Sequence, residues 1–100
     1  MRGALYSTAD LARAVVAGSL LDVSQEAAHA GWTCPVMITP AAVVASGGDR
    51  QGTVRALVAG RVVASTSDGD RIRWPVVRGT LRAQIGGDDG HPVIVISAEE

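Results

Sequence analysis

The fold is indicated by two stretches along which polar and apolar residues alternate, Arg71-Ile72-Arg73-Trp74 and Thr80-Leu81-Arg82-Ala83-Gln84-Ile85. Alternation with a period of two is typical of β-strands, in which successive side chains point to opposite faces of the sheet. A third stretch, Pro92-Val93-Ile94-Val95-Ile96, is apolar throughout and indicates a buried strand. Residues Gly86 to Gly90 before it form a turn signal. The sequence therefore predicts a three-stranded antiparallel meander over residues 71–97.

The chain before Asp70 follows helical spacing instead. We expect helices over residues 8–17, 24–30, 41–45 and 54–64. In the last of these, Gly60 and several β-branched residues lower the helix propensity. Their expected N-caps are Ser7, Ser24, Thr39 and Thr53. We also expect a short strand or extended link at Leu20–Val23, and a strand at Trp32–Ile38 that Pro35 places at an edge or a bulge.

These elements together predict one α+β domain over residues 1–100. Its sheet has three or more antiparallel strands, and short helices from the N-terminal half cover the apolar face.

The charged residues exclude several functions. The net charge is −1 and all nine basic side chains are arginines. Without a lysine the chain has neither a Walker A loop nor a Schiff-base amine, and without a net basic charge it lacks the usual field of a nucleic-acid binder. A single cysteine, Cys34, favours a reducing compartment and therefore the cytoplasm. No apolar run approaches the about 20 residues of a membrane span, so we expect no membrane partner.

Candidate catalytic and metal-binding residues are few. His29, Cys34 and His91 are too widely spaced for a structural zinc site, which needs about four closely spaced ligands. Asp68-Gly69-Asp70 and Asp88-Asp89-Gly90 lack the ligand ladder of a calcium loop and are better read as turns. We therefore expect no metal, no cofactor and no enzymatic activity.

The loop Gly47-Gly48-Asp49-Arg50-Gln51-Gly52 precedes an expected helix and could hold an anion at the helix N-terminus. Without a lysine or a clear preceding strand, an ordinary surface loop is the favoured interpretation.

Arginines gather on one side of the predicted sheet. Arg71 and Arg73 share a face of their strand, as do Arg82 and Gln84 of the next. A solvated sheet face explains this pattern, and so does a binding surface, because arginine is enriched in interfaces and makes bidentate contacts to carboxylates and phosphates. Trp74 continues the alternation and lies either in the core or at the rim of this patch. We count these five residues as the candidate binding site.

Several segments resemble a family of small proteins of unknown function that plasmids, integrative elements and phages carry. The matching residues are Tyr6-Ser7, residues 18–24, residues 27–31, Pro35-Val36 with Thr39, and residues 85–96. The middle departs from the family, which tends to have tryptophans where this chain has Val43-Val44-Ala45 and residues 54–58. The resemblance implies an accessory gene of a mobile element and carries over no catalytic residue.

Three functions follow as hypotheses. The first is a non-enzymatic interaction protein that modulates a host protein, in its sharpest form as an inhibitor of host defence of the anti-CRISPR or antirestriction type. The alternative is a nucleic-acid-binding accessory factor that uses the arginine-bearing face. The second alternative is a small enzyme acting through Cys34 or the acidic turns. The partner is accordingly a host protein or a protein–nucleic-acid complex, and the sequence leaves its identity and the oligomeric state open.

Overall fold

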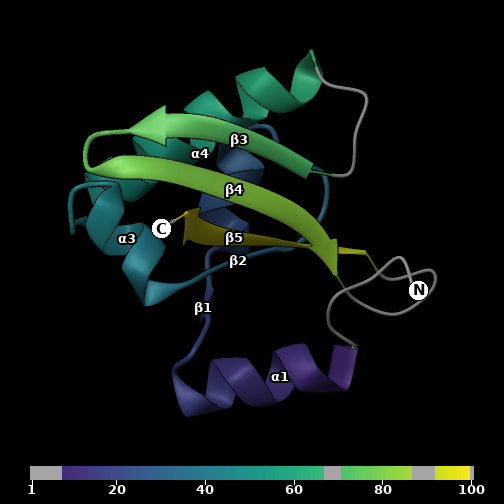
Figure 1. Ribbon diagram of the computed structural model, residues 1–100. Helices are drawn as coiled ribbons and strands as arrows, with labels where there is room; N and C mark the ends of the chain where they lie inside the picture. Colours follow the sequence, from purple (N-terminus) through teal and green to yellow (C-terminus); the bar gives the residue numbers. More distant parts are fainter. Residues whose placement is uncertain (1–7, 67–70, 87–91, 100) are drawn as a thin grey trace.

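A computed structural model describes residues 8–66, 71–86 and 92–99, and Figure 1 shows its elements. The helices are α1 (Thr8–Ala17), α2 (Ser24–His29), α3 (Pro40–Ala45) and α4 (Arg50–Ser65). The strands are β1 (Leu21–Asp22), β2 (Val36–Ile38), β3 (Arg71–Val76), β4 (Gly79–Gly86) and β5 (Val93–Glu99). Helices and a mostly antiparallel sheet confirm the α+β class, and the helices precede the long strands as expected.

The strands form one five-stranded sheet in the order β1-β2-β5-β4-β3. The predicted meander is confirmed, since β3 pairs antiparallel with β4 and β4 antiparallel with β5. The sheet then continues beyond the meander: β2 pairs parallel with β5, and β1 antiparallel with β2. The parallel neighbour on its far side explains why the first four residues of β5, Val93 to Ile96, are all apolar, because both faces of this part of the strand are covered.

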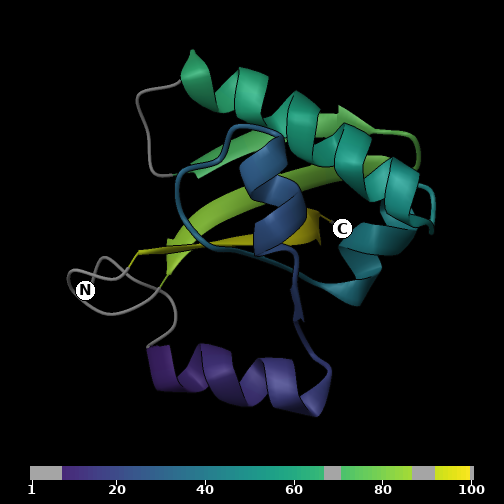
Figure 2. The same ribbon diagram turned by 180° about the vertical axis from the view of Figure 1, so that it is seen from behind.

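Helices cover the two faces of the sheet unequally. The main core, which includes Ile38, Leu57, Trp74 and Ile96, lies between the sheet and helices α2, α3 and α4 (Figure 2). Helix α1 lies on the opposite face, where Leu11 and Leu20 pack with Val93, Val95 and Met37. Because α1 covers only the β2–β5 part of that face, no helix of the described residues lies over its β3–β4 part.

Helix α4 begins earlier than the sequence indicated. Its N-cap is Asp49, whose Oδ1 accepts a hydrogen bond from the Gly52 amide at 2.7 Å, so the expected cap Thr53 already lies inside the helix. Gly52 is buried in the first turn, and a Cβ there would collide with the carbonyl oxygen of Ser46. Of the glycines that made residues 47–52 resemble a loop, Gly52 therefore lets the helix start close against the preceding turn.

Two other local expectations change. The expected strand at Trp32–Ile38 is reduced to β2, which lies inside the sheet and not at its edge. Ser24 is the first residue of α2 and not its cap, since its amide donates to Asp22 Oδ1 at 2.9 Å. The hydroxyl of Ser24 instead accepts from the Val36 amide at 3.0 Å and so ties α2 to β2. The expected cap Ser7 lies outside the described residues, whereas Thr39 caps α3 as expected.

Helix α4 lies very close to the sheet at Gly60. A Cβ added there would lie 2.5 Å from Cζ2 of Trp74, whose side chain is 2% exposed. The missing side chain lets the indole ring lie directly against the helix backbone. The glycine that weakened the helical pattern is therefore the residue that allows α4 to dock on β3.

We predict that Gly60→Ala destabilises the fold despite improving helix propensity. The substitution gains up to about 1 kcal/mol of propensity, whereas overpacking a filled core typically costs about 1–3 kcal/mol. The unfolding midpoint in urea should fall. Val62→Ala on the exposed side of the same helix is the control and should change stability by only about 0.5 kcal/mol. A more stable Gly60→Ala protein would contradict the packing argument.

Candidate functional site

The candidate site lies on the β3–β4 part of the sheet face that carries α1, where no described helix covers the strands, and its geometry follows from strand register. Arg71 is the partner of Gln84 across β3 and β4, and Arg73 is the partner of Arg82. All four side chains therefore lie on one face, which we call the arginine face. The three arginines are exposed, and Gln84 is half-buried beside Val95, where the apolar cluster under α1 begins.

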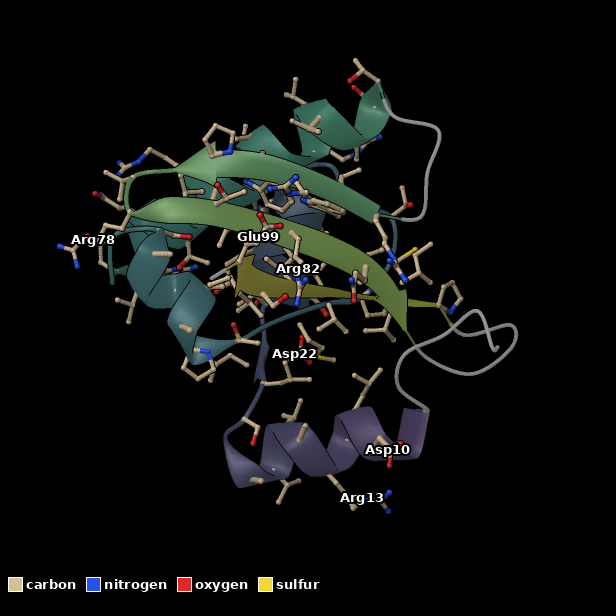
Figure 3. All side chains as sticks on the ribbon, viewed as in Figure 1. Asp10, Arg13, Asp22, Arg78, Arg82 and Glu99 are labelled. Atoms are coloured by element: carbon tan, nitrogen blue, oxygen red, sulfur yellow. The ribbon has the colours of Figure 1, made fainter. Side chains whose placement is uncertain are left out.

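Strand β5 supplies polar neighbours to two of these arginines. Ser97 is the cross-strand partner of Arg82, and its hydroxyl accepts a hydrogen bond from Arg82 Nε at 3.2 Å. Glu99 accepts from Arg73 in an ion pair. Figure 3 shows Arg82 and Glu99 on the same side of the sheet.

The charges on this face do not balance. Glu99 pairs with Arg73, and no ion pair of Arg71 or Arg82 occurs within the described part of the chain. Arg73 and Arg82 also lie directly opposite each other, an arrangement of like charges that destabilises a strand pair. The face is thus a locally positive surface on a chain of net charge −1, and folding stability does not explain it.

Trp74 does not belong to this surface. It is the partner of Leu81, points to the opposite face of β3 and packs in the main core against Gly60. Its place among the candidate binding residues was therefore wrong, and of the two positions considered for it, the core is the observed one. The alternation put Trp74 in phase with Ile72, which is also buried.

The remaining candidate residues are not brought together into a site. Cys34 is half-buried after α2 and His29 is exposed at the end of that helix. Among the described residues no group of three histidine, cysteine or acidic side chains could hold a metal ion. His91 and the acidic turns at 68–70 and 88–90 lie outside those residues. No helix in the described ranges has the length and apolarity needed to cross a bilayer.

The structure contains a groove that sequence reasoning missed. It measures about 400 Å³ and lies between the first half of α4, the turn before it and the end of β3, and we call it the edge groove. Its lining residues are Ser46, Gly47, Asp49, Gly52, Arg55, Ala56, Ala59, Pro75, Val76, Val77 and Arg78. Gly47, Asp49 and Gly52 thus line a groove, while the first turn of α4 is capped by Asp49 itself, which argues against the anion cradle considered from the sequence.

Only the tertiary fold brings the two arginines of this groove together. Arg55 lies on α4 and Arg78 in the turn between β3 and β4, and no sequence spacing links them. The backbone amide of Arg78 donates to the Ala45 carbonyl at 2.9 Å, which holds the turn against the end of α3.

Comparisons of the chain with protein-family models, with curated proteins and with solved structures find no match. Functional inference therefore starts from the geometry of the two arginine-bearing surfaces.

We predict that Arg82→Gln leaves the free energy of unfolding unchanged at low salt or raises it, by up to about 1 kcal/mol, because it removes a like charge opposite Arg73. The gain should fade as salt screens the repulsion. Arg71→Gln, opposite a neutral residue, is the matched control and should show no such salt dependence. A loss of about 1 kcal/mol or more in the Arg82 variant would mean that this arginine stabilises the fold.

Proposed function

We propose that this chain is a non-enzymatic interaction protein that binds an acidic surface of a host protein through the arginine face. The observation that carries the proposal is the placement of Arg71, Arg73 and Arg82 together on the β3–β4 part of one sheet face, where among the described residues one carboxylate, Glu99, forms an ion pair, with Arg73. Arginine forks make bidentate contacts to carboxylates, and two neighbouring strands hold the three side chains at defined spacing.

Charge favours a protein partner over a free nucleic acid. A binder of phosphate backbones draws most of its affinity from many basic contacts and shows a basic field around the domain. Here the arginine face is local and the chain as a whole is slightly acidic. Binding through this face to a protein, or to a protein–nucleic-acid complex, agrees better with that distribution.

The genetic context implied by the sequence resemblance sharpens the proposal. An accessory protein of a mobile element meets host defence systems, so the partner we propose is a component of such a system, and binding would inhibit it. The proposed location is the cytoplasm, which the single cysteine favours.

The first test compares the host proteins captured by the wild-type chain with those captured by the triple variant Arg71→Ala, Arg73→Ala and Arg82→Ala. We expect the triple variant to keep its circular dichroism spectrum, because exposed charges usually change stability by only about 0.5 kcal/mol. Affinity for the captured partner should fall by about thirtyfold or more, the usual effect of losing central interface arginines.

Two controls separate a specific interface from general charge. The double variant Arg13→Ala and Arg50→Ala removes two positive charges where the triple variant removes three, but from α1 and α4, and should bind as wild type. Affinity that falls steeply with salt, together with capture of nucleic acid, would favour the nucleic-acid alternative. Equal binding by wild type and triple variant would show that the arginine face is ordinary solvated surface.

A further inference from the structure

Strand β3 ends the sheet, and within the described residues no strand pairs with its outer edge. In an antiparallel ladder, every second residue turns its N–H and C=O toward the partner strand. Val76 and Gly79 close a two-residue hairpin turn and are therefore a hydrogen-bonding pair, which turns the backbone of Arg71, Arg73 and Pro75 outward. Pro75 has no N–H, so the outward donors of β3 are the amides of Arg71 and Arg73.

The edge groove lies at the C-terminal end of this open edge, beside Pro75 and the hairpin turn. Pro75, Val76 and Val77 line one side, and Ala56 and Ala59 of α4 line the other. In Figures 1 and 2, α4 lies alongside β3, the last strand of the sheet. An edge strand with a helix beside it is the geometry in which an extended peptide can add as a further strand.

The charged side chains near the β3 edge indicate which kind of peptide could bind there. Arg55 and Arg78 line the edge groove, and neither forms an ion pair with any described residue. The groove's carboxylate, Asp49, already accepts the Gly52 amide. On the other side of β3, Arg71 and Arg73 occupy alternate positions of the arginine face. Both flanks of the edge are therefore positive.

We propose that the β3 edge takes an extended acidic peptide segment by strand addition. Carboxylates at alternate peptide positions would lie opposite Arg71 and Arg73, and the intervening small apolar side chains would enter the edge groove. The inference deepens the proposed function and rests on it in one respect, the acidic character of the partner.

The same charges argue against a second copy of this chain as the occupant. Antiparallel pairing of two β3 edges would place arginines of one copy opposite arginines of the other, and like charges directly opposite each other destabilise a strand pair. An acidic strand replaces that repulsion with cross-strand attraction.

The test uses the full chain and three synthetic peptides as long as β3. The first alternates glutamate and valine, the second alternates lysine and valine, and the third repeats the first with methylated backbone nitrogens. We expect the glutamate peptide to bind and the lysine peptide not to bind. Methylation should weaken binding by about tenfold or more, because it removes backbone hydrogen bonds and leaves the side chains unchanged.

A second readout locates the contact. Saturation with the glutamate peptide should slow hydrogen exchange at the Arg71 and Arg73 amides, the two outward donors. In the double variant Arg55→Glu and Arg78→Glu, the affinity for the peptide should fall by about tenfold or more. The control variant Arg13→Glu with Arg50→Glu should bind the peptide as wild type does. Circular dichroism of each variant confirms that its fold is retained.

The outcomes separate this inference from the proposed function. Equal binding of the methylated peptide, unchanged exchange at both amides, or no peptide binding would overturn strand addition, while loss of the captured partner in the triple arginine variant would still support the arginine face. Slowed exchange at both amides with full partner binding by the triple variant would support strand addition and overturn the arginine face. A dimer in light scattering that the peptide does not dissociate would assign the edge to a second copy.

Discussion

The contact between Trp74 and Gly60 positions helix α4 against the sheet. A core with no phenylalanine and two tryptophans must place these large rings where they fill the most space. Trp74 is almost fully buried, and it fits only because Gly60 presents bare helix backbone to the ring. This contact sets how closely α4 approaches β3. The position of the helix in turn defines the edge groove, and the buried tryptophan holds the strand whose opposite side carries Arg71 and Arg73.

The second tryptophan holds the same helix through a hydrogen bond. Trp32 donates its indole N–H to the Leu57 carbonyl at 2.9 Å, and Arg61 donates from Nε to the Gly31 carbonyl at 2.8 Å. Both bonds join α4 to the turn after α2, so the helix is held by the turn and by β3 together. The indole N–H of Trp74, by contrast, finds no acceptor among the described residues. Burial of its large apolar surface offsets the cost of that unpaired donor.

The arginine face and the edge groove are related by the charge that they carry. Both place positive charge around one strand, β3, where the sheet ends, and the pairing of Arg73 with Arg82 costs stability. Charged side chains and a proline on an edge strand also discourage unwanted strand pairing. The features that make self-association unfavourable are those that favour an acidic partner strand, because selectivity arises from repulsion of the wrong partner as well as attraction to the right one.

The sequence by itself determined the strand periodicity, the antiparallel meander, helix α1 and the shared face of Arg71, Arg73, Arg82 and Gln84. These features depend on residues close in sequence or on simple alternation. Other features became clear only from the tertiary structure. They are the addition of β1 and β2 to the sheet, the burial of Trp74, the early start of α4 after Asp49, and the placement of Arg55 and Arg78 in the lining of one groove. Extended segments were expected near both β1 and β2, but strands of two and three residues carry too little periodicity to give their bounds or their pairing in the sheet. A glycine that weakens an isolated helix is favourable only when a neighbouring ring occupies the space beside it, and that neighbour comes from a distant part of the chain.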